Sequence, residues 1–169
     1  MLKKLMMPCK KVDKITDIPI DFFINNNFEY ILLDVDNTLI DLKENKLTGI
    51  KEWCDEAKSK GLKLCIASNS AKQKKVKKVA EYLEIPYVYR SMKPFLIGLK
   101  KAMKILNADP TKTVEIGDQI FTDVIGANRM KLFSILTTPF EIEHNVFDKI
   151  KRKIEANYIE KNNIENSKF

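Results

Sequence analysis

Short apolar runs alternate along this chain with segments in which apolar residues recur at helical spacing. The strand-like runs lie at residues 30–35, 62–67, 87–90, 113–117 and 131–137. Helical spacing occurs at residues 48–60, 71–83, from Pro94 onward, and at 120–129. Because one helix separates each strand from the next, the strands are expected to pair in parallel through right-handed crossovers. The pattern therefore predicts an α/β fold, a three-layer, doubly wound, Rossmann-like sheet of five parallel strands.

The two ends of the chain are expected to extend this core. With 169 residues, the chain is long enough for one ordinary core and too short for two. We divide it into an N-terminal extension that packs on the core, at residues 1–28, the core itself at 29–140, and a C-terminal part at 141–169. In the last part, apolar positions from Val146 to Tyr158 predict a helix, and the polar stretch KNNIENSKF predicts a frayed end.

Two aspartates, Asp34 and Asp36, end the first apolar run, which reads ILLDVDNTLI. Their spacing points both side chains to one face of a strand, where two like charges require a cation or a shared proton. The chain has no GxxxxGK[ST] or GxGxxG motif that would cradle a phosphate group. Phosphate chemistry would therefore depend on carboxylates and a hard cation such as Mg²⁺.

Three further polar clusters follow later predicted strands. ASNS follows the second strand, KP comes after the third, and GDQIFTD ends the fourth. Because the carboxyl ends of parallel strands meet at one edge of a sheet, the four clusters are expected to converge there. Each alone also has a structural interpretation, such as an Asx turn at Asp36, a helix cap at Ser68 or Ser70, or a surface lysine at Lys93. Their convergence favours a site that handles phosphate.

Hydrolysis of a phosphate monoester needs a nucleophile, a proton donor for the leaving oxygen, and positive charge around the transferred group. Asp34 is placed to attack phosphorus, and Asp36 to protonate the leaving group and then deprotonate water. Ser68 can donate its hydroxyl hydrogen to a phosphate oxygen, and Lys93 supplies a compact cation.

The fourth cluster supplies two more acids. Asp118 would complete the carboxylates around the metal ion. Asp123 would hold Asp118, a metal-bound water or Lys93 from behind. In a purely structural interpretation, both acids would instead be favoured by the dipole at the start of a helix.

The motifs DVDNT, ASNS, KP and GDQIFTD resemble those of the haloacid dehalogenase (HAD) superfamily of aspartate-based phosphatases. The segments MPCKKVDKITDIPIDFF, YRSMKP and GDQIFTDVIGANR are similar to subfamily IIIA phosphatases of the YqeG type, which resemble the mitochondrial phosphatidylglycerophosphate phosphatases. The resemblance extends from about residue 8 to residue 139. It implies a HAD-type fold and Mg²⁺-dependent hydrolysis of a phosphomonoester.

The resemblance also implies a role for each matched residue. Asp34 would be the nucleophile that forms an aspartyl-phosphate, and Asp36 the acid and base that also offers its backbone carbonyl to Mg²⁺. The residues that bind the substrate phosphate would be Ser68, Asn69 and Lys93. The metal ligands would be Asp34, Asp36 and Asp118, with Asp123 behind them.

The intervals between the motifs leave no room for a cap domain. Members of the superfamily often insert a cap after the first motif or between the second and third, and here those intervals are residues 37–47 and 69–92. They fit a short flap, and one helix with one strand. An uncapped site cannot by itself close over a small substrate and exclude water. The substrate is therefore expected to be large or presented by a membrane, unless another subunit supplies a lid.

An excess of basic residues bears on the choice of partner. Lys and Arg number 30 against 23 Asp and Glu, a formal net charge of +7 that favours anionic partners. The N-terminal sequence LKKLMMPCKK predicts peripheral contact with an acidic membrane. The run KQKKVKK could bind nucleic acid, but its Val76 belongs to the apolar stripe of a helix, so no nucleic-acid partner is expected. The leading hypothesis for the substrate is an anionic lipid headgroup such as phosphatidylglycerophosphate. Two alternatives stay open: a phosphatase for a soluble sugar phosphate, nucleotide or phosphoprotein, and a basic nucleic-acid- or protein-binding module on the same fold.

The cysteine, histidine and hydropathy patterns argue against zinc enzymes, Ser-His hydrolases and membrane-spanning proteins. Cys9, Cys54 and Cys65 are odd in number and lack CxxC spacing, which favours reduced thiols and a cytoplasmic location. His144 is the only histidine, so zinc chemistry and a Ser-His pair are poorly supported. No window approaches the 18 apolar residues of a membrane span, so the chain is expected to be soluble or peripheral at a membrane. Whether it forms an oligomer stays open.

Overall fold

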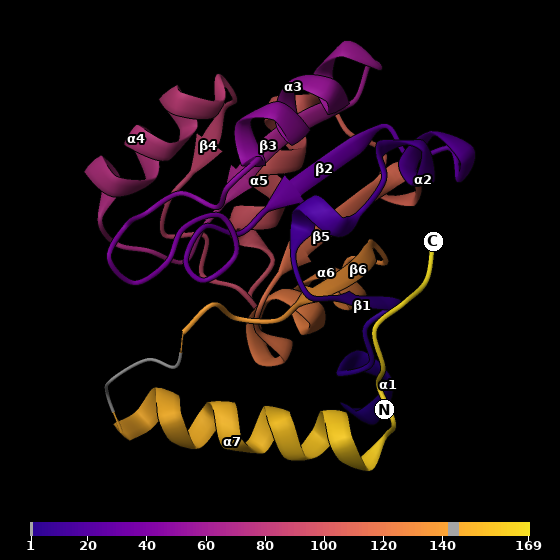
Figure 1. The fold of residues 1–169 in the computed structure, drawn as a ribbon, viewed down its shortest axis with the longest axis vertical. Helices are drawn as coiled ribbons and strands as arrows, with labels where there is room; N and C mark the ends of the chain where they lie inside the picture. Colours follow the sequence, from indigo (N-terminus) through magenta and orange to yellow (C-terminus); the bar gives the residue numbers. More distant parts are fainter. Residues whose placement is uncertain (1, 142–145) are drawn as a thin grey trace.

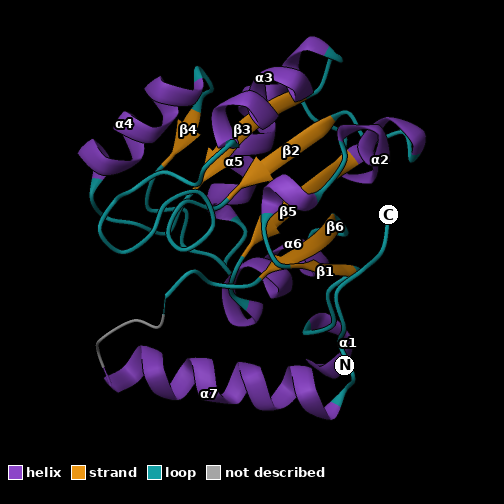
Figure 2. Ribbon diagram, viewed as in Figure 1, coloured by secondary structure: helices purple, strands orange, loops and turns teal. Residues whose placement is uncertain are grey.

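The computed structural model describes residues 2–141 and 146–169, and its centre is one parallel sheet (Figures 1 and 2). The strands lie in the order β1-β6-β5-β2-β3-β4, and every neighbouring pair is parallel. Their bounds are β1 Lys10–Val12, β2 Tyr30–Leu33, β3 Lys63–Ala67, β4 Tyr87–Val88, β5 Thr113–Gly117 and β6 Phe133–Thr137. From β2, the strands β3 and β4 follow on one side and the strands β5 and β6 on the other. The position of β2 is therefore the topological switch point of a doubly wound sheet.

Helices cover both faces of this sheet. Their bounds are α1 Leu2–Leu5, α2 Ile20–Asn25, α3 Ile50–Ser59, α4 Gln73–Leu83, α5 Ile97–Leu106, α6 Ile125–Arg129 and α7 Val146–Lys161, with short turns η1 Ile15–Asp17, η2 Pro110–Lys112 and η3 Ile120–Val124. Alternate residues of β2 face opposite sides: Ile31 and Leu33 pack with α2, α3 and α4, while Tyr30 and Leu32 pack with α5 and α6. The predicted three-layer α/β architecture is therefore confirmed, with α7 lying outside the layers (Figure 1).

The sheet has six strands, so the predicted count of five is wrong. The missed strand, β1, is only three residues long and reads KKV, which has no recognisable apolar pattern. It becomes a strand because it pairs with β6, with Lys10 opposite Ile135 and Val12 opposite Thr137. The other five strands lie within the predicted ranges, although β4 is shortened to two residues.

Helix boundaries differ from the sequence pattern in two places. The helix predicted from Pro94 begins at Ile97, after a loop. The helix predicted at residues 120–129 is divided into a π-helical turn, η3, and the short α6. The helix predicted at residues 48–60 ends at Ser59, shortly before Gly61, which adopts a positive φ of +88°.

The two ends of the chain meet at the β1 edge of the sheet. Phe23 of α2 is fully buried, and Trp53 donates a hydrogen bond from Nε1 to the carbonyl of Ile18 at 2.8 Å. After α7, the backbone N–H of Ser167 donates to the carbonyl of Lys11 at 2.7 Å, and the ring of Phe169 packs edge-on against the ring of Phe22. Residues 164–169 form neither helix nor strand, and these two contacts hold them against the β1 edge. The fraying expected for this end stays a prediction.

The two intervals where a cap domain would be inserted contain only short elements. Residues 37–47 form a flap, in which Ile40 bridges to Asp36 and to Lys46, and residues 69–92 hold only α4 and β4. Among the residues that the structure describes, no helix is both long enough and apolar enough to cross a membrane.

Candidate active site

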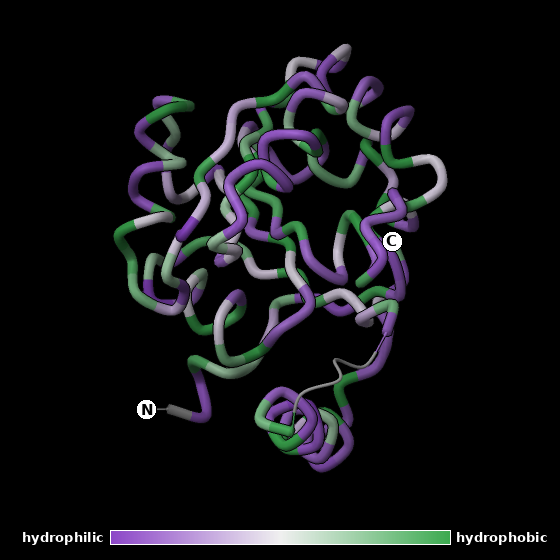
Figure 3. Tube along the Cα trace, turned by 90° about the vertical axis from the view of Figure 1, so that its left-hand side faces the viewer, coloured by the Kyte–Doolittle hydropathy of each residue, from purple (hydrophilic) through white to green (hydrophobic). Residues whose placement is uncertain are grey.

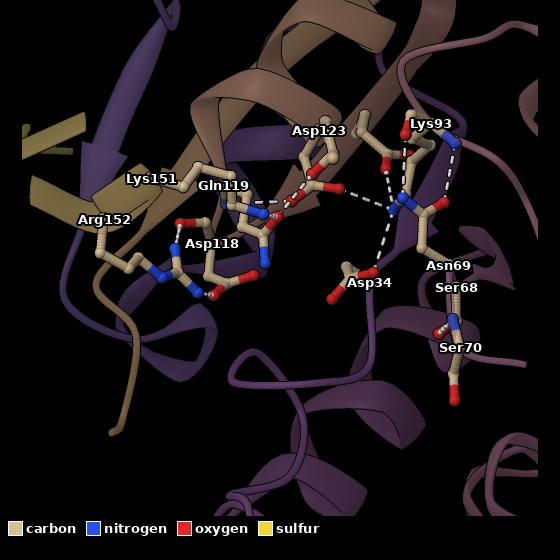
Figure 4. A network of polar contacts seen from close by, with 12 residues as sticks. Asp34, Ser68, Asn69, Ser70, Lys93, Asp118, Gln119, Asp123, Lys151 and Arg152 are labelled. Carbon is tan, nitrogen blue, oxygen red and sulfur yellow. Dashed lines mark hydrogen bonds and ion pairs between the residues drawn. The ribbon is translucent and has the colours of Figure 1, made fainter. Parts of the chain in front are cut away.

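Polar side chains gather at the carboxyl edge of β2, β3 and β5, beside the switch point. Asp34 directly follows β2 and continues its pairing with β5, because its N–H donates to the carbonyl of Ile116 at 2.9 Å. Ser68 follows β3, and Asp118 follows β5. Lys93 reaches the same place from the loop after β4 (Figure 4). The predicted convergence of these residues at one edge is therefore what the fold produces.

The side chain of Lys93 is fully buried and lies among three carboxyl groups. Its Nζ is 2.8 Å from Asp123, 3.0 Å from Glu115 and 3.1 Å from Asp34 (Figure 4). Burial lowers the pKa of Lys93, but these three groups outweigh that effect and raise its pKa well above the usual value. Lys93 is therefore a fixed positive charge next to Asp34.

The backbone of Lys93 is held by Asn69. The Asn69 Oδ1 atom accepts a hydrogen bond from the N–H of Lys93 at 2.7 Å, and Nδ2 donates to the Lys93 carbonyl at 2.9 Å. Both polar ends of the Asn69 side chain are thereby used on another loop (Figure 4). In this structure Asn69 holds the loop of Lys93 in place, and its contact with a substrate phosphate stays a prediction.

Ser68 is buried at the base of the same loop. The N–H of Ser70 donates to the Ser68 Oγ atom at 3.1 Å, so the hydroxyl hydrogen can be donated to another acceptor. Ser68 also pairs through its backbone with Val88 and Ser91, which ties the ends of β3 and β4 together. Its position fits the predicted contact with a phosphate oxygen.

Asp123 is fixed by its own turn and by a close approach to β5. Its Oδ2 atom accepts a hydrogen bond from the N–H of Gln119 at 2.9 Å. A Cβ atom at Gly117 would lie 2.4 Å from the carboxyl carbon of Asp123, so only glycine leaves room for this side chain. With one carboxylate oxygen on Lys93 and the other on Gln119, Asp123 connects the fourth motif to the lysine.

Three buried carboxylates, on Asp34, Asp118 and Asp123, can share one cation. One oxygen of each lies within 4.8 Å of the others. Burial raises the pKa of Asp34 well above its usual value, Lys93 opposes this, and the nearby Asp123, Asp118 and Asp36 raise it further. A donor set made only of carboxylate oxygens with excess negative charge suits a hard divalent cation.

Asp36 is the predicted site residue whose carboxylate lies apart. Its side chain is 39% exposed and forms an ion pair with Lys75 of α4. Its carboxylate is not part of the buried cluster of Asp34, Asp118 and Asp123. The family resemblance predicted that Asp36 would offer the metal ion only its backbone carbonyl. The Asp36 side chain therefore lies at the rim of the site, while Asp34 lies inside it.

Two charged residues of the site were missed by the sequence analysis. Glu115 lies within β5, is 1% exposed, and has its pKa raised to about 8, chiefly by burial and against the effect of Lys93. A glutamate inside the otherwise apolar TVEIG could have been a signal. Arg152 of α7 donates to the carbonyl of Asp118 at 2.8 Å and forms an ion pair with its carboxylate. Nothing in the local pattern around Arg152 indicates this, and His144 lies outside the described residues.

Comparison with known proteins agrees with this geometry. The model of a family described as mitochondrial PGP phosphatase matches residues 1–140. The chain is 33% identical over 156 residues to "Probable phosphatase YqeG" of Bacillus subtilis, an alignment that covers 92% of this chain and 90% of that protein.

Solved structures share the fold at low sequence identity. A "possible sugar phosphatase" of the HAD superfamily from Cytophaga hutchinsonii has a TM-score of 0.63 at 10% identity, covering 92% of this chain and 95% of that one. The cobalt-bound deoxy-D-mannose-octulosonate 8-phosphate phosphatase of Haemophilus influenzae has a TM-score of 0.54 at 13% identity, covering 80% and 89%. These likenesses bear on the fold alone.

Proposed function

This chain belongs to the mitochondrial PGP phosphatase family and is a HAD-type phosphatase of the YqeG type, and from that premise we propose its mechanism and substrate. It would hydrolyse a phosphomonoester through an aspartyl-phosphate on Asp34, with Mg²⁺, and its substrate would be phosphatidylglycerophosphate. One observation carries the mechanism: Asp34, at the end of the central strand, lies 3.1 Å from a fully buried lysine and within a three-carboxylate cluster.

In the first step, an oxygen of the Asp34 carboxylate attacks phosphorus and the ester P–O bond breaks. Lys93 offsets negative charge on the phosphoryl oxygens, and Ser68 donates a hydrogen bond to one of them. The leaving oxygen takes a proton from Asp36. Before this step, Asp36 must leave its ion pair with Lys75 and take up a proton from solvent, which a side chain at the rim can do by rotating.

In the second step, the now ionised Asp36 takes a proton from water, the water oxygen attacks phosphorus, and the bond to Asp34 breaks. Inorganic phosphate leaves, and both aspartates return to their starting states. Asn69 and Asp123 position Lys93 throughout, since each contacts it directly.

The residues that would hold Mg²⁺ are Asp34, Asp118 and the backbone carbonyl of Asp36, with Asp123 behind them or joining them. When bound, the ion would supply positive charge that offsets the repulsion between Asp34 and a phosphate dianion. The excess of carboxylates over cations in this buried cluster supports the choice of a divalent cation.

Two observations support a large or membrane-presented substrate. The flap at residues 37–47 and the segment 69–92 contain no cap domain that could close over a small substrate. The family and the basic surface agree with an anionic lipid headgroup. We also propose that the protein meets this substrate at the surface of an acidic membrane.

Phosphate release tests these proposals. The protein is assayed on phosphatidylglycerophosphate in detergent micelles, an aryl phosphate, a sugar phosphate and a nucleotide, each with Mg²⁺ and with EDTA. We expect Mg²⁺-dependent release that is highest for the lipid and falls to below about one hundredth in Asp34→Asn, because a lost nucleophile costs several kcal/mol of barrier. A matched surface control, Asp55→Asn, should keep full activity, since that carboxylate is half exposed on α3.

Activity that persists in EDTA or in Asp34→Asn would reject the mechanism. Strong turnover of a soluble ester, with none of the lipid, would keep the mechanism and reject the lipid in favour of a soluble substrate.

A further inference from the structure

Helix α7 is held to the core chiefly by its charged side. Its buried residues are Arg152 and Glu155. Arg152 binds both the carbonyl and the carboxylate of Asp118, and Glu155 accepts a hydrogen bond from the N–H of Phe121 at 3.0 Å. Tyr158 adds a partly buried contact with a small apolar cluster. This face of α7 therefore lies against the loop that carries Asp118.

The opposite side of α7 is apolar and open to solvent. Four large hydrophobic residues are exposed there: Val146 by 72%, Phe147 by 77%, Ile150 by 56% and Ile154 by 50%. Three of them are spaced by four residues and the fourth is adjacent, so they form one stripe along the first half of the helix. The helix is seen nearly end-on in Figure 3, outside the layers of the core. An amphipathic helix normally buries such a stripe, and among the described residues nothing covers this one.

Basic residues lie next to the stripe. Lys149 and Lys153 are exposed and lie along one side of it. The hydroxyl of Tyr158 donates to the carbonyl of Lys3 at 2.9 Å, which places α1, with its exposed Lys3 and Lys4, beside the same helix. An apolar stripe with flanking lysines is typical of helices that lie in the interface of an anionic bilayer.

We infer that the α7 stripe, Val146, Phe147, Ile150 and Ile154, docks this protein on an anionic lipid bilayer. The lysines complement lipid phosphates, and the stripe enters the boundary between headgroups and acyl chains. This inference deepens the proposed function. The purpose of docking rests on the proposed lipid substrate, whereas docking itself requires no substrate.

A cavity behind the helix agrees with a lipid partner. It has a volume of about 620 Å³, lies between α7 and the core, and reaches Asp118. Much of its wall is apolar, from residues such as Ile120, Leu136 and Ile159. The outer face of α7 would contact the bilayer. The inner face of the same helix borders this apolar cavity and Asp118, the predicted metal ligand.

Vesicle co-sedimentation of the full chain, without substrate, tests the inference. Vesicles of phosphatidylcholine with about 30% phosphatidylglycerol are compared with pure phosphatidylcholine at low and high salt. We expect binding to the anionic vesicles that weakens with salt, and at least a tenfold loss of apparent affinity in Phe147→Ser/Ile150→Ser. The control, Tyr82→Ser/Ile105→Ser, removes an aromatic and an isoleucine that are exposed by 42% and 46% on α4 and α5, away from the stripe, and should stay within about twofold.

Lys149→Gln/Lys153→Gln should reduce the preference for anionic over neutral vesicles. Thermal unfolding of each variant verifies that it is folded. Equal binding by the stripe variant and its control, or no binding by the unmodified protein at low salt, would overturn the inference. A stripe variant that converts a dimer into a monomer in analytical ultracentrifugation would also overturn it, because the face would then join two copies. Vesicle binding without turnover of phosphatidylglycerophosphate would reject that substrate and leave the docking inference intact.

Discussion

Replacing Glu115 with Gln should make the stability of this protein less sensitive to rising pH. Glu115 is buried in β5 with one oxygen 3.0 Å from Lys93, and burial raises its pKa from 4.5 to about 8. Between these two values the folded protein keeps a proton that the unfolded chain releases. Stability contributed by this site is therefore greatest at low pH and decreases as pH rises toward 8.

The magnitude follows from linkage. One proton retained only by the folded state lowers the free energy of unfolding by about 1.4 kcal/mol for each pH unit. Over the interval from about pH 5 to pH 7.5, this amounts to about 3 kcal/mol. Glutamine keeps the shape of protonated glutamate and an oxygen that can accept from Lys93, but it does not titrate. The variant should therefore gain about 3 kcal/mol relative to the unmodified protein across this interval.

Urea unfolding at several pH values in EDTA, followed by fluorescence of Trp53, measures the difference between the two proteins. The surface variant Glu81→Gln on α4 serves as control, and its difference should stay nearly constant with pH, since Glu81 is exposed. A constant difference for Glu115→Gln would refute the argument. If the variant were less stable than the unmodified protein by the same amount at every pH in this interval, Glu115 would be ionised and paired with Lys93 throughout.

Three further predictions concern the rim, the α7 contact and the core. Asp36→Asn should keep metal affinity, because its carbonyl remains, while turnover falls more for an alkyl phosphate than for an aryl phosphate; equal losses measured in parallel assays would exclude the acid role. Asp118→Ala should weaken Mg²⁺ dependence and also destabilise the protein by about 2 kcal/mol in urea unfolding, because it removes the partner of buried Arg152. That cost should shrink when Arg152 is already Met, and additive costs in this double-mutant cycle would show that the pair does not interact. Phe23→Ala should cost about 3–5 kcal/mol in urea unfolding, because Phe23 is fully buried, and a loss below about 1 kcal/mol would contradict its place in the core.

The alternation of strand and helix patterns was enough to predict the three-layer parallel architecture, and with it the place of the site. Parallel strands run in one direction, so residues that follow them in the sequence must meet at one edge. Asp34, Ser68 and Asp118 were predicted for that reason, and Lys93 joined them because its loop follows β4. Both the direction of the strands and the period of their apolar residues are local properties, which a sequence displays directly.

Other parts of the site depend on partners distant in the sequence. The strand at Lys10–Val12 exists because β6 offers its edge, and Asn69 holds Lys93 because two loops meet. Arg152 reaches Asp118 from a helix outside the sheet, across 34 positions. Hydrogen bonds and ion pairs form wherever atoms come within range, so no pattern near either residue reveals them. The amino-acid sequence by itself therefore determined which residues gather at the sheet edge. Only the tertiary structure decided which of them are in contact, because contact depends on distance in space and not on spacing along the chain.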